Sequence, residues 1–185
     1  MKKYGIIYAD PPWKYLWGGG KDGGHFAPEK HYHTMGTADI CALDVKKLRD
    51  TNCALFLWAT MPALPDAFLV MEAWGFKYKT CAFSWVKTRA DGEALRGMGS
   101  YTKSNVELCL LGMRGHIKAL DKTVPQVLMH PRLGHSVKPP VVRDRIVQLF
   151  GDLPRIELFA RQECPGWDAA GYGIDGLSLE DRLNQ

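Results

Sequence analysis

Four consecutive residues near the start of the chain, Asp10-Pro11-Pro12-Trp13, bring together a carboxylate, two prolines and an indole ring. They follow a short apolar run, Ile6–Ala9, which predicts a buried strand. Proline has no N–H to donate and fixes its own φ, so the two prolines end the strand and stiffen the turn. A carboxylate in a rigid turn at the carboxyl end of a strand is where open α/β sheets bind ligands. A plain turn does not require this combination, so the stretch predicts an active site.

The segment after this turn predicts a loop that covers it. Five glycines fall within the seven residues Gly18–Gly24, and glycine-rich chain is costly to fix. We therefore expect a mobile loop near residues 14–33 that becomes ordered on substrate. The rings of Trp13, Tyr15 and Trp17 are predicted to stack on a base, with ordinary core packing as the alternative.

A second mobile loop is expected near residues 88–104, which are rich in Gly, Ser, Lys and Arg. Arg89, Arg96 and Lys103, with Asn105 at the end of the loop, are predicted to contact substrate, the cations through a phosphate backbone. A solvated loop explains each of these residues equally well when it is taken alone. Their grouping favours the nucleic-acid interpretation.

Neither a metal site nor a disulfide framework is predicted. His25, His31 and His33 lie close together, but no Asp or Glu completes a ligand spacing, so we expect loop packing or substrate contact. The cysteines are odd in number and form no Cys-x-x-Cys pair, which indicates reduced and mostly buried thiols. They are Cys41, Cys53, Cys81, Cys109 and Cys164.

Apolar runs of strand length alternate with segments of helical spacing along the 185 residues. This alternation predicts an α/β domain with a mostly parallel sheet, and the length suits one domain spanning residues 1–185. The predicted strands include Ala54–Ala59, Ala82–Val86, Val106–Gly112 and Arg155–Ala160. The predicted helices include Asp66–Trp74 and Val141–Phe150.

The apolar runs are too short to span a bilayer, and Asp10 interrupts the one that follows Met1-Lys2-Lys3. We therefore expect no signal peptide, no membrane partner and a cytoplasmic protein. The net charge of +4 permits a polyanionic partner without requiring one.

Asp10-Pro11-Pro12-Trp13 resembles the Asp-Pro-Pro-Trp signature of the MT-A/METTL-type family of N6-adenine methyltransferases. The resemblance continues in the same order over nearly the whole chain, and the compact length is similar to the bacterial or phage branch. The further matching segments are Tyr32–Met35, Leu55–Thr60, Ala73–Phe76, Trp85–Thr88, Asn105–Leu108, Leu111–Gly115, His135–Pro139, Ile156–Arg161 and Gly166–Asp168.

The resemblance implies a Rossmann-like methyltransferase fold with helices on both faces of a mostly parallel central sheet. The motif order is permuted, so that the catalytic motif comes first and the C-terminal part supplies most of the S-adenosylmethionine pocket. Relatives carry Gly-Asn where this chain has Gly171-Tyr172, so either the Tyr172 hydroxyl substitutes, or cofactor affinity is weaker, or the local alignment slips. The resemblance implies cofactor binding by Asp10, Ser136, Lys138, Arg161, Gln162 and Tyr172.

The residues of the turn suit chemistry on an exocyclic amine, whose lone pair is conjugated with the ring. Two acceptors that hold both N–H groups free this lone pair, and Asp10 offers a carboxylate while Pro11 offers a backbone carbonyl. The fixed φ of Pro11 and Pro12 holds these acceptors in place. Trp13 would stack on the base, and the sulfonium methyl is already activated, so no metal is required.

The predicted function is therefore transfer of a methyl group from S-adenosylmethionine to adenine N6 in DNA. The same reaction on RNA is the near alternative, and a catalytically inactive nucleic-acid-binding partner subunit is the alternative from another class. A base in a duplex must flip out to reach such a site. We therefore expect single-stranded or locally opened substrate, and a homodimer or a second subunit that completes the binding surface.

Overall fold

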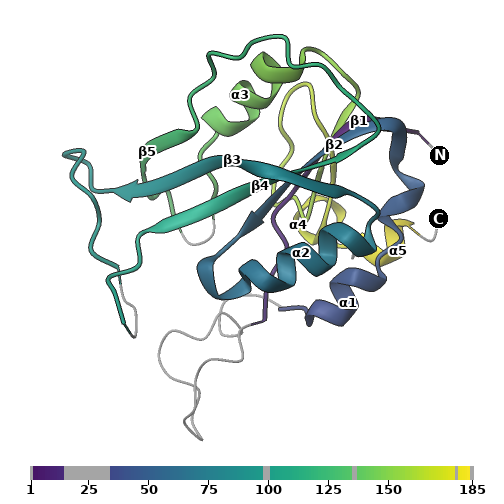
Figure 1. The fold of residues 1–185 in the computed structure, drawn as a ribbon. Helices are drawn as coiled ribbons and strands as arrows, with labels where there is room; N and C mark the ends of the chain where they lie inside the picture. Colours follow the sequence, from purple (N-terminus) through teal and green to yellow (C-terminus); the bar gives the residue numbers. More distant parts are fainter. Residues whose placement is uncertain (1, 15–33, 98–100, 135–136, 178, 184–185) are drawn as a thin grey trace, which may run out of the picture.

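Strand β1 (Tyr4–Ala9), the apolar run before Asp10, lies inside a seven-stranded sheet of order β5-β3-β4-β2-β1-β6-β7 (Figure 1). The computed structural model describes residues 2–14, 34–97, 101–134, 137–177 and 179–183. The other strands are β2 (Arg49–Ala59), β3 (Lys77–Thr88), β4 (Val106–Arg114), β5 (Val127–Pro131), β6 (Arg155–Leu158) and β7 (Asp168–Ala170). The α-helices are α1 (Thr37–Ala42), α2 (Leu64–Ala73), α3 (Val141–Phe150), α4 (Tyr172–Asp175) and α5 (Leu179–Leu183).

The sheet is mostly parallel, which confirms the predicted α/β class. β1 pairs in parallel with β2 and β6, β6 pairs in parallel with β7, and β3 pairs in parallel with β5. β4 alone among the named strands runs against its neighbours, β2 and β3. Two antiparallel steps restore the direction, so β3 runs the same way as β1 and ends at the same edge of the sheet.

Helices cover both faces of the sheet, as the family resemblance implied. Along β1 the side chains alternate, with Ile7 facing α1 and α2 and with Ile6 and Tyr8 facing α3. Figure 1 shows α3 on the side of the sheet opposite α1 and α2. Because burying one large apolar side chain stabilises a fold by roughly 1.5–3 kcal/mol, these two layers fix β1 and the turn that follows it.

The helix boundaries follow from local sequence. Helix α3 has the predicted bounds, and it ends at Gly151, whose φ of 81° suits glycine. Helix α2 begins at Leu64, two residues before the predicted start, with Pro65 in its first turn. It ends before Gly75, whose φ is 75°.

The strands are longer than their apolar runs. β2 begins five residues before the predicted Ala54, because its pairing with β4 continues to Cys53 and its pairing with β1 reaches Arg49 opposite Tyr4. Most of the loop expected near residues 14–33 lies outside the described residues, as do residues 98–100 of the second loop. Within the described ranges, no helix is long and apolar enough to cross a membrane.

Candidate active site

Asp10 lies where several parallel strands end at one edge of the sheet. β2 ends at Ala59, β1 at Ala9 and β6 at Leu158, and these strands are neighbours in register. Residues at and just beyond these strand ends, together with Glu107 of β4 and Lys138 before α3, line a cavity of about 80 Å³. Its walls are formed by Asp10, Pro11, Pro12, Trp13, Trp58, Ala59, Thr60, Glu107, Lys138 and Arg161. The Asp10 turn, Lys138 and Arg161 therefore meet at one cavity.

The two prolines form a tight turn held by backbone hydrogen bonds. The Trp13 N–H donates to the Pro11 carbonyl at 2.9 Å, and the Met35 N–H donates to the Pro12 carbonyl at 2.8 Å. A carbonyl oxygen has two lone pairs, so the Pro11 carbonyl keeps one for a further donor. The turn thus supplies one carboxylate and one half-used carbonyl beside the cavity.

Trp13 is packed in the core and also lines the cavity beside Asp10. The side chain is only 5% exposed, and its Nε1–H donates to the Trp58 carbonyl at 3.0 Å. The ring therefore ties the turn to β2 and leaves little surface for a base. Tyr15 and Trp17, the other predicted stacking residues, lie outside the described residues, as do His25, His31 and His33.

A chain of four alternating charges begins at the cavity, which Asp10, Lys138 and Glu107 line, and ends at Lys87. Lys138 Nζ donates to Asp10 Oδ2 at 2.7 Å and lies 3.3 Å from Glu107 Oε2. Glu107 Oε1 in turn accepts a hydrogen bond from Lys87 Nζ. Lys138 also lies 5.5 Å from the centre of the Trp58 ring, a cation–π distance. Sequence reasoning missed Glu107 and Lys87 as site residues, although an acid inside the apolar strand β4 is a signal that points to a partnered, functional group.

Burial and pairing set the protonation of these groups. Burial raises the pKa of Asp10, and the nearby Lys138 offsets this only in part. Burial alone would lower the pKa of Lys138, but the Asp10 and Glu107 carboxylates outweigh it and raise the pKa, so Lys138 stays protonated at neutral pH. Burial alone would raise the pKa of Glu107, but Lys138 and Lys87 lower it. Among the three, Asp10 is the group most ready to accept a proton.

The segment after β6 is packed tightly against the segment after β7. Phe159 has a φ of 60°, a left-handed conformation that a bulky residue adopts only under constraint. A Cβ on Gly171 would lie 2.5 Å from the Ala160 backbone, and one on Gly173 would lie 2.6 Å from Arg161 Cα. Strained backbone and glycine-only approach at a strand end are typical of nucleotide and cofactor loops.

Comparison with known proteins agrees with this geometry. A family model described as MT-A70 matches residues 4–173.

The chain belongs to the MT-A70 family of methyltransferases.

This confirms the resemblance drawn from the Asp10–Trp13 turn. The chain is 36% identical over 198 residues to the Type II methyltransferase M.MunI of a Mycoplasma species, covering 97% of this chain and 81% of that protein. It is 27% identical to the human N(6)-adenine-specific methyltransferase METTL4, and 26% identical to its mouse counterpart. Each of these two matches covers 94% of this chain but only 38% of the METTL4 protein.

The predicted cofactor residues divide into those the structure brings together and those it does not. Asp10, Lys138 and Arg161 share the cavity, and Arg161 is exposed at its surface. Gln162 follows Arg161 and is also exposed, while the Tyr172 side chain at the start of α4 is 75% exposed. Ser136 lies outside the described residues.

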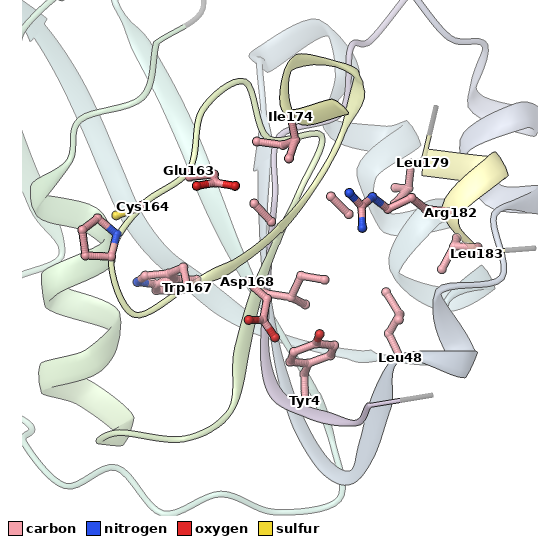
Figure 2. Close-up of a pocket in the computed structure, with 14 residues that line it drawn as sticks. Tyr4, Leu48, Glu163, Cys164, Trp167, Asp168, Ile174, Leu179, Arg182 and Leu183 are labelled. Carbon is pink, nitrogen blue, oxygen red and sulfur yellow. The ribbon is translucent and has the colours of Figure 1, made fainter. Parts of the chain in front are cut away.

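A larger pocket of about 820 Å³ lies along the β7 edge, beyond the Arg161 segment (Figure 2). Figure 2 shows Glu163 and Ile174 on one side of the pocket and Tyr4 and Leu48 on the other. Its further lining residues are Ile156, Cys164, Pro165, Trp167, Asp168, Ala169, Ala170, Leu179, Arg182 and Leu183. Among the residues that the structure describes, this pocket shares no lining residue with the small cavity beside Asp10.

The basic loop stands at the same sheet edge, because β3 ends and β4 begins there. Arg89 is paired inside the loop, with Asp91 at 3.2 Å and Glu93 at 3.5 Å, so part of its charge is already neutralised. Arg96 and Lys103 are exposed. Asn105 is half-buried, and its backbone carbonyl accepts a hydrogen bond from the Lys87 N–H. Asn105 therefore helps to fix the base of the loop.

Proposed function

We propose that this protein transfers a methyl group to the N6 amine of adenine in DNA, with Asp10 and the Pro11 carbonyl as the two acceptors for the amine. The observation that carries the proposal is the Asp10 carboxylate, fixed by a proline turn and a buried lysine beside a cavity at the strand ends. A Type II methyltransferase and two N(6)-adenine-specific methyltransferases among the relatives support the same reaction.

S-adenosylmethionine is the proposed methyl donor, and the residues beyond β6 fit it. The Arg161 and Lys138 cations suit the carboxylate of its methionine part, and Glu163 suits its ribose hydroxyls, as an acid near a strand end does in dinucleotide sites. Gly171 and Gly173 leave no room for a Cβ, so the backbone turns closely there. The sulfonium of the donor supplies an electrophilic methyl group that needs no metal.

The chain's own groups hold the amine and receive its proton. Asp10 and the Pro11 carbonyl accept hydrogen bonds from the two N–H groups of the adenine amine. These bonds draw the nitrogen toward a tetrahedral geometry, which frees its lone pair. The nitrogen would gain a bond to the methyl carbon as the carbon–sulfur bond of the donor breaks and a neutral thioether leaves, and the nitrogen would then lose one proton. Lys138 is already protonated, so we assign the proton to Asp10, whose pKa is raised by burial. Trp13 serves the turn by anchoring it to β2.

The proposed substrate is single-stranded DNA or an adenine flipped out of a duplex, since a stacked base cannot reach the cavity. Arg96 and Lys103 are the proposed phosphate contacts, with Arg89 in a weaker part. We also propose that residues 1–185 act as one methyltransferase domain in the cytoplasm, with a homodimer or a second subunit widening the binding surface.

The test is transfer from methyl-tritiated S-adenosylmethionine to matched DNA and RNA oligonucleotides, with and without adenine. We expect label in N6-methyladenine of single-stranded DNA, identified by mass spectrometry of the nucleosides, and none in the oligonucleotides that lack adenine. Greater transfer to RNA would establish the RNA alternative. Binding of both cofactor and DNA without any transfer would overturn the proposal in favour of an inactive partner subunit.

A further inference from the structure

We propose that Glu107, anchored by Lys87, is a positioning residue that sets how strongly Lys138 engages Asp10. The inference rests on the proposed function, in which Asp10 must accept hydrogen bonds from the adenine amine. Neither Glu107 nor Lys87 needs to touch the substrate for this role. Both act through the ammonium group of Lys138.

The first argument is that Lys138 is shared between two carboxylates. Its ammonium group donates to Asp10 at 2.7 Å and lies 3.3 Å from Glu107. The side chain of Lys138 is 10% exposed, that of Asp10 is 22% exposed and that of Glu107 is 13% exposed. An ammonium group has three donors, so it can serve both acids at once. Without the Glu107 carboxylate, the Lys138 ammonium group would interact more strongly with Asp10. It would then compete with the adenine amine for the Asp10 carboxylate.

The second argument is that Glu107 is itself held in place. Its two oxygens are divided between two lysines, with Oε1 accepting from Lys87 and Oε2 facing Lys138. Lys87 lies 5.2 Å from the centre of the Trp85 ring, and Trp85 is the direct cross-strand neighbour of Glu107. A carboxylate fixed on both oxygens loses little freedom when it orients a third group.

The third argument is the place of Lys87 at the root of the basic loop. Its N–H donates to the Asn105 carbonyl, and its own carbonyl accepts the Leu95 N–H at 2.7 Å. The backbone of Lys87 is therefore tied to both sides of the loop that carries Arg96 and Lys103. Lys87 thus links the base of the proposed DNA-binding loop to the chain of alternating charges that leads to Asp10.

The charges make a prediction with two opposite signs. Removing the Glu107 charge leaves Lys138 to Asp10 alone and removes a nearby negative charge, so the pKa of Asp10 should fall. Removing the Lys87 charge strengthens the interaction of Glu107 with Lys138, which weakens the interaction of Lys138 with Asp10. It also removes a positive charge, so the pKa of Asp10 should rise. The other groups that face Asp10 are Arg161 after β6 and the Cys109 thiol of β4, and neither is changed.

The experiment compares E107Q, K87M and K87R with the wild type by the pH dependence of kcat/KM for methyl transfer to single-stranded DNA. We expect the acidic limb to move to lower pH in E107Q and to higher pH in K87M, each on the order of one pH unit. K87R should keep the wild-type limb because it keeps the charge. K47M is the matched lysine control, since Lys47 forms an ion pair with the exposed Asp44 and does not line the cavity.

A second measurement is independent of activity. The ¹³C shift of the Asp10 carboxyl, followed against pH in protein labelled at aspartate and assigned by its loss in D10N, should give the same opposite displacements. An inactive wild type would defeat the proposed function while this titration still tested the inference. The inference would be overturned if the variants had lower activity at every pH but the same acidic limb and the same Asp10 carboxyl titration as the wild type. Glu107 and Lys87 would then have only structural roles.

Discussion

At the scale of single residues, the candidate site depends on a carboxylate whose burial and whose neighbouring cation act in opposite directions. Burial raises the pKa of Asp10 and Lys138 offsets this rise only in part, so Asp10 is a better proton acceptor than an exposed aspartate. A lysine whose own pKa is raised cannot act as the base. The two groups therefore have distinct parts, acceptor and counter-charge.

The first prediction concerns Asp10. Asp10→Ala removes one amine acceptor and the proton acceptor together, so transfer should fall by at least about 100-fold, the loss typical of one preorganised hydrogen-bonding group. Cofactor binding should stay measurable by calorimetry, because Arg161 and the glycine turn are untouched. Transfer by the wild type should also decline as pH falls through the raised pKa of Asp10. Near-normal turnover by Asp10→Ala would remove this residue from the mechanism.

The second prediction concerns Tyr172, the residue that departs from the family pattern. Its side chain is 75% exposed, so its hydroxyl is not held toward the cavity by packing. Tyr172→Phe should therefore change the calorimetric Kd for S-adenosylmethionine less than about twofold, since an exposed group contributes little net energy. Tyr172→Asn, which restores the residue of the relatives, should tighten binding. A tenfold loss in Tyr172→Phe would instead show that the hydroxyl replaces the missing amide.

The sequence was sufficient to predict Asp10 and its two prolines, because the motif and the strand before it are contiguous. It was not sufficient for the partners, since Lys138 is 128 residues away and the role of Glu107 depends on the β3–β4 register. The sequence also left the place of Trp13 open. An aromatic ring suits a core and a stacking site equally well, and the structure adds that the Trp13 side chain is buried and donates to the Trp58 carbonyl.

At the scale of elements, the predictions held where one face of an element is apolar. Helix α3 buries Val142, Ile146 and Phe150 at helical spacing, and its bounds were predicted without error. Strand β5 was not predicted. Its Val127 and Met129 are exposed while Leu128 is buried, so its apolar residues point to both faces and give no alternation. Pairing with β3, which the sequence does not reveal, fixes this strand.

The third prediction concerns the contact between the ends of β6 and β7. A methyl group on Gly171 would lie 2.5 Å from both the nitrogen and the oxygen of Ala160, which are backbone atoms that cannot move aside. Gly171→Ala should lower the free energy of unfolding by about 1–3 kcal/mol and weaken cofactor binding, because Arg161 must shift. Denaturant unfolding and calorimetry would measure both effects.

The control for this prediction is Gly36→Ala. The nearest atom to a Cβ there is the flexible Asp39 carboxylate at 3.2 Å, and the φ of −66° suits alanine. Gly36→Ala should leave both quantities nearly unchanged. If Gly171→Ala behaved like this control, the close approach of Gly171 to the Ala160 backbone would have no part in positioning Arg161.

At the scale of the whole molecule, strand direction gathers the chemistry at one edge. β1, β2, β3 and β6 all run the same way, so the Asp10 turn, the root of the basic loop and the Arg161 segment share that edge. Strand order could not be read from the sequence, because it is set by pairings between distant segments. The net charge of +4 is too small to show where a polyanion binds, and the loop cations at this edge supply that information.

The last prediction uses this arrangement to test how DNA is held. Binding of a single strand weakens with salt by about 0.7 in the slope of log K against log salt for each phosphate neutralised. Arg96→Gln and Lys103→Gln should each reduce the slope by about that amount, because both cations are exposed. Arg89→Gln is the matched control and should reduce it less, since Asp91 and Glu93 already balance its charge. Fluorescence anisotropy of a labelled adenine-containing oligonucleotide between 50 and 200 mM salt, roughly the range over which such contacts are felt, measures all three. Wild-type slopes in Arg96→Gln and Lys103→Gln would show that the polynucleotide does not lie along this loop.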